Sequence, residues 1–254
     1  MKYDILDKEY KEFVLNIEEN FNKEKNTLFQ QRNIIKVLSF NNKKYAVKSF
    51  KIPHLLNKVV YRFFRKSKAK RSYLNSVRLI ELDINTPKPI GYIEFSKGLL
   101  FKESYYISEL FDYDFEIRAV FSDIDFKNRD FILDKFIEFT YDLHQKGVYH
   151  IDYSPGNILV KVVNGSYIFS IIDVNRMKFV SFDNELRMES LTKLTNLKKD
   201  NDFLLHKYSE VSLINKNILS EKLYKKLEKQ HNYLERKKKL KKLKFMIKDL
   251  FNEK

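Results

Sequence analysis

Two short apolar runs near the N-terminus flank a polar tetrapeptide. The first run spans residues 33–40 and the second residues 45–50, with Asn-Asn-Lys-Lys at 41–44 between them. Runs rich in β-branched and aromatic residues on either side of an Asn-Asn pair are typical of an antiparallel hairpin. We therefore predict strands over these runs, and further strands over 90–94 and 99–110.

A repeat of three to four residues interrupts these strands. Over residues 66–82, apolar side chains from Ala69 to Ile80 fall on one stripe, which predicts an amphipathic helix. The helix must end before Thr-Pro-Lys-Pro at 86–89, because the residue before a proline avoids helical backbone. Apolar residues recur at the same spacing over 131–144 and predict a second helix, which Gly147 terminates.

A second hairpin follows this helix. The apolar runs 158–163 and 167–172 flank Asn164-Gly165, which is a strong hairpin signal because both turn positions take positive φ. After Asp173 the chain is polar and helix-prone to its end.

The order of these elements predicts the fold class. We expect an α+β chain in two lobes, an antiparallel-sheet N-terminal lobe over residues 1–109 and a mainly helical C-terminal lobe over 110–254. The chain has no cysteine, which excludes a disulfide scaffold, an iron–sulfur cluster and a cysteine nucleophile.

The positive charge of the chain is confined to two segments. Its 49 basic and 34 acidic residues give a net charge of +15. Residues 58–71 hold seven basic residues and no acid, and residues 222–254 hold 13 basic and four acidic ones. These segments, at +7 and +9, leave the rest of the chain at −1. A polyanionic partner or an anionic surface is the first inference, and a merely solvated surface is the alternative.

The basic C-terminal segment, residues 222–254, is also amphipathic. Leu240, Leu243, Ile247 and Leu250 recur three or four residues apart, with lysines between them. A basic amphipathic helix suits the headgroups of anionic lipids. The alternative is a helix whose leucines pack on the C-terminal lobe and whose lysines are solvated.

The segment from His150 to Asn157 carries the candidate chemistry. It reads H-x-D-x-x-x-x-N and precedes the second hairpin, whose last strand leads to Asp173. A carboxylate at Asp152 can accept a proton from an attacking hydroxyl, and the amide oxygen of Asn157 can bind magnesium. The hairpin returns Asp173 beside Asn157, where it can hold magnesium on nucleotide phosphates. This is the order of parts in protein kinases, and it predicts an ATP- and Mg²⁺-dependent phosphotransferase with a protein-kinase-like fold.

The N-terminal lobe of such an enzyme binds the nucleotide. Ala46-Val47-Lys48 fits the V-A-I-K pattern, which directs Lys48 to the α- and β-phosphates. Backbone groups near Glu109 and Phe111, at the predicted hinge between the lobes, are candidates to bind adenine. No glycine precedes Gly91, so a glycine-rich phosphate loop is impossible here. Backbone amides of an earlier turn must take its place, and Arg32 can add charge to that turn.

The helix predicted over 66–82 also departs from protein kinases, which place a glutamate there to pair with the strand lysine. No acid lies between Lys66 and Arg78, and Glu81 lies near the helix end. Asn75 or Ser72 is the candidate for a weaker contact with Lys48. A pseudokinase, which binds nucleotide without transfer, is therefore an alternative function.

From about Arg32 to Arg176 the chain resembles the lipopolysaccharide kinase (Kdo/WaaP) family. The resemblance rests on Ser-Lys-Ala-Lys-Arg-Ser-Tyr at 67–73, on Asn-Thr-Pro-Lys-Pro at 85–89, on the loop from His150 to Asn157, and on Ile-Asp-Val-Asn-Arg at 172–176. The Thr-Pro-x-Pro after a basic helix is the piece most typical of the family. Where the family often has Arg-Glu-aromatic, this chain has Arg-Ser-Tyr.

The resemblance implies transfer of the ATP γ-phosphate to a hydroxyl of Kdo or heptose in the inner core of lipopolysaccharide, at the cytoplasmic face of the inner membrane. It implies roles for six residues: Lys48 for phosphate, Asp152 as catalytic base, Asn157 and Asp173 for magnesium, His150 as a brace of the loop, and Arg176 as a partner of Asp152 or of the acceptor. The expected partners are a lipid A–core glycolipid and an anionic membrane, with no nucleic acid. A protein or small-molecule acceptor is the alternative, and a nucleic-acid-binding protein is less favoured, since it leaves these residues without a role.

Overall fold

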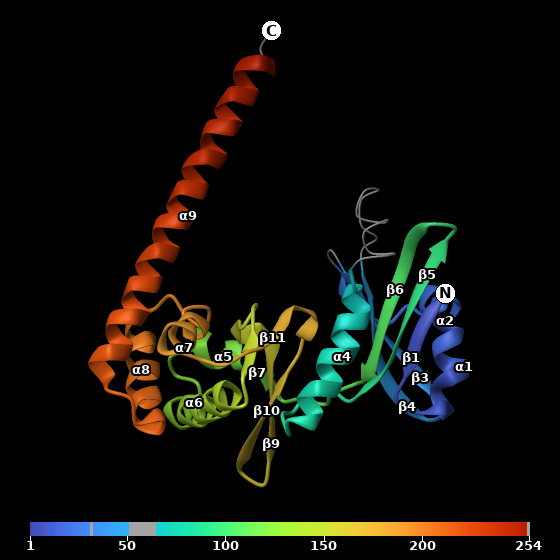
Figure 1. Ribbon diagram of the computed structural model, residues 1–254, viewed down its shortest axis with the longest axis horizontal. Helices are drawn as coiled ribbons and strands as arrows, with labels where there is room; N and C mark the ends of the chain where they lie inside the picture. Colours follow the sequence, from blue (N-terminus) through green and yellow to red (C-terminus); the bar gives the residue numbers. More distant parts are fainter. Residues whose placement is uncertain (31–32, 51–64, 253–254) are drawn as a thin grey trace. The chain divides into compact units, whose positions relative to one another are not determined.

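The computed structural model describes residues 1–30, 33–50 and 65–252, with side chains up to residue 242 (Figure 1). The chain forms two compact units. The first consists of Met1–Phe126 with Val148–Phe179, and the second of Lys127–Gly147 with Val180–Lys254. Every predicted site residue that the structure describes belongs to the first unit. The lobe boundary expected near residue 109 stays a prediction.

A six-stranded antiparallel sheet, in the order β1-β5-β6-β4-β3-β2, forms the first part of this unit. Its strands are β1 (Lys2–Ile5), β2 (Thr27–Gln30), β3 (Asn33–Phe40), β4 (Lys43–Phe50), β5 (Pro89–Lys97) and β6 (Leu100–Glu109). The predicted hairpin is confirmed as β3 and β4, and Asn41 and Asn42 between them have φ values of 47° and 59°. The strands expected over 90–94 and 99–110 are β5 and β6.

Helices cover both faces of this sheet (Figure 1). On one face, α1 (Lys11–Leu15) and α2 (Ile17–Lys23) bury aromatic and aliphatic side chains against the sheet, Val47 among them. On the other face, α4 (Lys68–Glu81) packs Ala69 and Tyr73 against Phe50 and Tyr92. Side chains alternate between the faces of a strand. Lys48 therefore shares the α4 face with Phe50, and its Nζ lies 5.4 Å from the centre of that ring.

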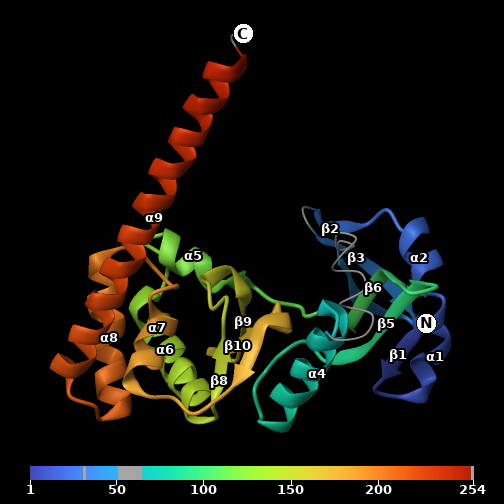
Figure 2. The same ribbon diagram turned by 45° about the horizontal axis from the view of Figure 1, so that its top comes forward.

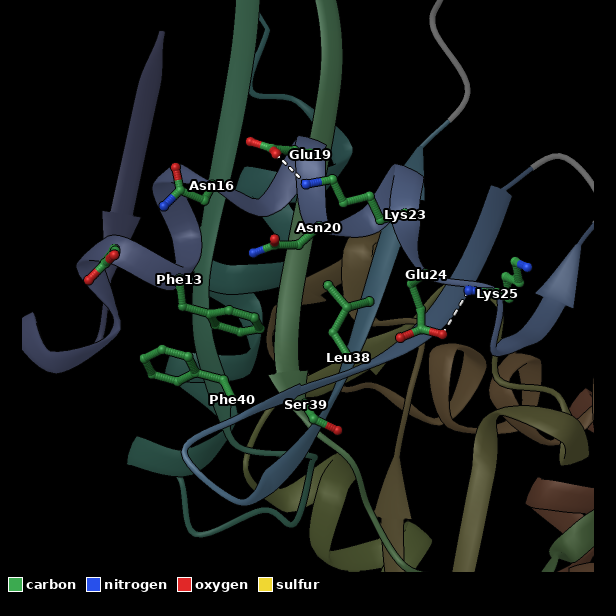
Figure 3. Close-up of a pocket in the computed structure, with 11 residues that line it drawn as sticks. Phe13, Asn16, Glu19, Asn20, Lys23, Glu24, Lys25, Leu38, Ser39 and Phe40 are labelled. Carbon is green, nitrogen blue, oxygen red and sulfur yellow. Dashed lines mark hydrogen bonds and ion pairs between the residues drawn. The ribbon is translucent and has the colours of Figure 1, made fainter.

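A groove of about 840 Å³ opens on the face that carries α1 and α2 (Figure 3). Phe13 and Phe40 stack at its base with ring centres 4.8 Å apart. Glu19 and Lys23, an ion pair of 2.5 Å on α2, lie at its rim. None of the predicted site residues that the structure describes lines this groove.

The rest of the first unit consists of short strands and turns. Its elements are β7 (Phe115–Glu116), α5 (Ile117–Ser122), β8 (Val148–His150), η2 (Pro155–Asn157), β9 (Ile158–Val163), β10 (Ser166–Ile171), η3 (Val174–Arg176) and β11 (Met177–Phe179). The second predicted hairpin is confirmed as β9 and β10, with φ values of 50° at Asn164 and 79° at Gly165. β7 pairs with β9, and β8 pairs with β11.

The second unit is helical, with α6 (Arg129–Gln145), α7 (Asn184–Leu191), α8 (Lys198–Ser212) and α9 (Lys216–Asn252) (Figure 2). The helix predicted over 131–144 is confirmed as α6. Arg129 and Asp200 form a buried ion pair of 2.7 Å. Nδ1 of His144 is hydrogen-bonded to the hydroxyl of Tyr208 at 2.7 Å, and its Nε2 to the hydroxyl of Ser190 at 2.8 Å. Burial, together with the nearby charge of Arg187, lowers the pKa of His144 to about 3.

Candidate active site

The loop that follows β8 is fixed at its start by His150, a buried residue. Nδ1 of His150 accepts a hydrogen bond of 3.0 Å from the backbone amide of Asp152. Its Nε2 therefore carries the proton and donates to the carbonyl of Ile172, at 3.1 Å. One imidazole thus joins the loop to the residue that precedes Asp173.

Asp152 is held by Arg176. Nη1 of Arg176 lies 3.1 and 3.0 Å from the two carboxylate oxygens of Asp152. Both side chains are about half exposed, at 53% for Arg176 and 43% for Asp152. The carboxylate is therefore oriented by a charge-assisted contact and still reachable from solvent. The sequence left open whether Arg176 orients Asp152 or the acceptor, and the contact seen here is with Asp152.

Asn157 closes the loop and connects it to the strand before Asp173. Its side-chain nitrogen donates to the carbonyl of Asp152 at 2.8 Å, and its backbone carbonyl accepts from the amide of Ile172 at 2.9 Å. The amide nitrogen faces the loop, so Oδ1 is the atom of Asn157 that can bind a metal. Two residues predicted to bind magnesium, Asn157 and Asp173, are thereby brought to neighbouring positions.

Asp173 forms an ion pair with Lys48 from the six-stranded sheet. The distance from Nζ to Oδ1 is 2.5 Å, and the side chains are 15% and 34% exposed. Burial by itself raises the pKa of Asp173, but the charge and the hydrogen bond of Lys48, with a further bond of 2.8 Å from Asn175, hold the pKa below its ordinary value. Asp173 is therefore an ionised carboxylate at neutral pH, the form that a metal requires.

Asp173 also has an unusual backbone, with φ 56° and ψ 42°. The side chain of Asn75, on α4, donates to the carbonyl of Val174 at 2.7 Å, directly after this residue. The side-chain nitrogen of Asn75 thus bonds to the backbone, and the expected contact of Asn75 or Ser72 with Lys48 stays a prediction. Glu81 pairs instead with Arg78 on its own helix, at 2.9 Å.

These residues fit a magnesium–nucleotide complex. Asp173 and Asn157 offer hard oxygen ligands, and magnesium usually takes one or two such protein groups together with phosphate oxygens and water. The described part of the chain holds no cluster of three or more histidine, aspartate or glutamate side chains suited to a metal. Lys48, whose side chain is 15% exposed, pairs with Asp173 and remains the candidate residue to bind phosphate.

Comparison with known proteins agrees with this geometry. The model of the lipopolysaccharide kinase (Kdo/WaaP) family matches residues 12–214. The chain belongs to this family. A solved structure described as WaaP in complex with acyl carrier protein has a TM-score of 0.61 and 16% sequence identity, and the match covers 90% of this chain and 99% of that one. No curated protein matches the chain. The α+β, protein-kinase-like fold predicted from the sequence is confirmed, and family membership supports a phosphotransferase of lipopolysaccharide biosynthesis.

The predicted nucleotide contacts of this kinase are described only in part. The amide of Glu109 donates to the carbonyl of Lys88 at 2.9 Å, so this N–H is not free to meet adenine. Phe111 lies in the segment between β6 and β7. Arg32, the cation predicted for the phosphate turn, lies outside the described residues. Adenine binding at Glu109 and Phe111 stays a prediction.

Three residues at the site were not assigned a correct role from the sequence. They are Asn75, Asn175 and Thr86, whose hydroxyl donates to the carbonyl of Ile171 at 2.8 Å. Asn175 and Thr86 stand inside two of the four segments on which the family resemblance rests. Their position in family-like segments indicated that these two residues matter, although it does not reveal which atoms Asn175 and Thr86 contact.

Proposed function

We propose that this member of the family is an ATP-dependent kinase that transfers the γ-phosphate to a hydroxyl of Kdo or heptose in the inner core of lipopolysaccharide. The observation that carries the proposal is the convergence of Lys48, Asp152, Asn157 and Asp173 in one unit of the structure. Family membership supports the class of acceptor.

Asp152 would act as the catalytic base toward the hydroxyl of the acceptor. Its carboxylate would orient the attacking sugar hydroxyl and take its proton as the new oxygen–phosphorus bond forms, while the bond from the γ-phosphorus to the bridging oxygen breaks and ADP leaves. Arg176 restrains the direction of the carboxylate through its contacts with both carboxylate oxygens. His150 acts through the loop, because both of its ring nitrogens are engaged with backbone groups.

Lys48, Asn157 and Asp173 would hold ATP and magnesium. ATP supplies the phosphoryl group, and Mg²⁺ neutralises charge on its phosphate oxygens. Lys48 binds the α- and β-phosphates, and Asn157 and Asp173 bind the metal through oxygen. Lys48 and Asp173 already neutralise each other at 2.5 Å, so neither charge is buried without a partner before ATP binds.

The test is transfer of labelled phosphate from ATP to purified lipid A–core acceptors. Asp152→Ala should lower kcat by about 100-fold or more, since general base catalysis contributes roughly 10²- to 10⁴-fold. Its ATP affinity should stay near that of the wild type. Asp125→Ala removes an exposed acid of the same unit and should keep wild-type kcat.

Other outcomes separate the alternatives. Transfer to a protein or a small metabolite but to no core acceptor would refute the proposed acceptor, while the assignment as a phosphotransferase would still hold. Binding of Mg²⁺–ATP without transfer to any core acceptor would identify a pseudokinase. Wild-type kcat in Asp152→Ala would remove Asp152 from the mechanism.

We further propose that α9 attaches the enzyme to the cytoplasmic face of the inner membrane. The start of the helix packs on α7, where Leu219 and Leu223 are fully buried and Lys226 pairs with Glu185 and Glu189. Farther along, α9 extends beyond α7 and α8 (Figure 1). There Tyr233 and Leu240 are 63% and 59% exposed. None of the helices in the described ranges is long and apolar enough to cross a bilayer.

The lysines around this exposed part favour an anionic surface. Nine basic and two acidic residues lie between 236 and 254. Each basic residue near an anionic membrane contributes about 1 kcal/mol, and apolar residues on the other side of the helix add to this.

Truncation after residue 235 tests the attachment, because it keeps the packed start of α9. Sedimentation should show weaker binding to vesicles that contain anionic lipid, with no change for neutral vesicles and unchanged kcat on a soluble acceptor. Equal sedimentation of the two proteins with anionic vesicles would contradict the proposal.

A further inference from the structure

An arginine from α5 lies against the catalytic loop at a position where the chain has glycine. Arg118 places its guanidinium on Gly156, the residue before Asn157. A Cβ atom at 156 would lie 1.5 Å from Nη2 and 2.5 Å from Cζ of Arg118. Gly156 does not have a positive φ, so its backbone alone does not require glycine. The missing side chain at 156 is therefore what admits the guanidinium to this place.

The backbone around Arg118 is fixed next to the loop. Glu116 pairs with Leu159 in the sheet formed by β7 and β9, and β9 begins directly after Asn157. α5 starts at the end of β7 and contacts η2, the turn that contains Gly156. The position of Arg118 thus follows from strand pairing and not from the side chain alone.

The guanidinium keeps an accessible edge. Its Nε lies 3.4 Å from the carboxylate of Glu116, and the Arg118 side chain is 64% exposed. An exposed pair of this kind contributes little, so a planar anion can compete for the Nη atoms. The loop from Tyr153 to Asn157 has no charged side chain, and Arg176 is engaged with Asp152. Arg118 therefore supplies a positive charge against this segment of the loop, separate from the charge that Arg176 directs to Asp152.

We propose that Arg118 binds an anionic group of the acceptor, a carboxylate or a phosphate, close to the hydroxyl that Asp152 activates. The inference rests on the proposed function and restricts the acceptors to those that carry a carboxylate or a phosphate. Guanidinium binds carboxylate and phosphate through paired N–H donors, which fixes orientation as well as charge. Gly156 acts by leaving room for this group.

The experiment compares phosphate transfer to three acceptors prepared from one Kdo–lipid A glycolipid: the intact molecule, its carboxyl methyl ester, and its dephosphorylated form. The variants are Arg118→Gln, Gly156→Ala and the double variant. Arg78→Gln, which removes an exposed, ion-paired arginine of α4, is the control. Kinetic constants for acceptor and for ATP are measured separately, and thermal unfolding checks the fold.

Arg118→Gln should raise KM for the intact acceptor roughly 10- to 100-fold, the range expected for a charge-assisted contact. KM for ATP should not change. For the acceptor that lacks the group bound by Arg118, the KM of Arg118→Gln should be close to the KM of the wild-type enzyme. If this acceptor is the methyl ester, the group is the carboxylate; if it is the dephosphorylated form, the group is a phosphate. Gly156→Ala should reproduce the effect, because the new methyl group displaces the guanidinium. The double variant should be no worse than either single variant.

Two results would overturn the inference alone. One is wild-type transfer with the same preference among the three acceptors in Arg118→Gln. The other is an equal loss of kcat on all acceptors, which would assign Arg118 to loop structure. Independent, additive losses in the double variant would overturn the role of Gly156. Absence of transfer by the wild-type enzyme to every acceptor would instead refute the proposed function, and the inference with it.

Discussion

Asn75→Ala tests how α4 is connected to the metal-binding aspartate. The substitution removes the donor of a 2.7 Å hydrogen bond to the carbonyl of Val174, a residue that is 3% exposed. A buried acceptor that loses its partner costs about 1–3 kcal/mol. Left-handed backbone at a residue other than glycine costs roughly 1–2 kcal/mol, and Asp173 has that conformation. Since the two energies are similar, the substitution can release Asp173 from its position.

The expected result is a rise in the Mg²⁺ concentration needed for half-maximal transfer, by about 10-fold for each 1.4 kcal/mol lost. The assay is phosphate transfer at saturating ATP over a Mg²⁺ titration. Ser76→Ala is the matched control, because it removes a hydrogen bond of 2.8 Å that joins the next residue of α4 to Tyr106. It should lower thermal stability without changing the Mg²⁺ dependence. A wild-type Mg²⁺ curve in Asn75→Ala, or the same shift in Ser76→Ala, would refute the reasoning.

Two further predictions concern the helical unit. Since the folded-state pKa of His144 is below the usual 6.5, the unfolded state binds the extra proton, and stability falls as the pH drops below that value. Between pH 6.5 and 5 the wild-type protein should lose about 2 kcal/mol of unfolding free energy through this residue. Urea unfolding should show that His144→Asn does not have this loss, whereas Ser190→Ala should keep the wild-type pH dependence. A wild-type pH dependence in His144→Asn would contradict the assignment. Asp200→Ala leaves Arg129 buried without its closest carboxylate and should destabilise by about 3–5 kcal/mol in the same assay. Asp130→Ala, which removes an acid 80% exposed and 3.8 Å from Arg129, should cost under about 1 kcal/mol, and equal costs would contradict the role of burial.

Local chemistry explains why much of the fold could be predicted from the sequence. Asn41, Asn42, Asn164 and Gly165 all take the positive φ that two-residue hairpins require, and each turn sets the register of its own strands. The stripe over 66–82 predicted α4 because the helix buries one face against the sheet. These signals involve residues close in sequence, so one chain is enough to read them.

The site was predictable only where spacing along the chain determines proximity. Asn157 and Asp173 flank one hairpin, so its geometry brings them together. The bond from Asn75 to Val174 spans 99 residues and ends on a backbone carbonyl. Every residue except proline offers the same backbone groups, so the identity of Val174 gives no sign that Asn75 will meet it. The same reasoning applies to Arg118, whose counterpart, Gly156, has no side chain at all.

The backbone on both sides of Asp173 is held by neutral hydrogen bonds from three different places in the chain. Thr86, His150 and Asn75 donate to the carbonyls of residues 171, 172 and 174, respectively. At about 1 kcal/mol each, their sum exceeds the roughly 1–2 kcal/mol that the left-handed backbone of Asp173 costs. Salt screens ion pairs but scarcely affects neutral hydrogen bonds. With no acid on α4 between residues 68 and 78, the connection between that helix and Asp173 therefore does not depend on an ion pair, and Lys48 can exchange Asp173 for phosphate while the aspartate stays in position.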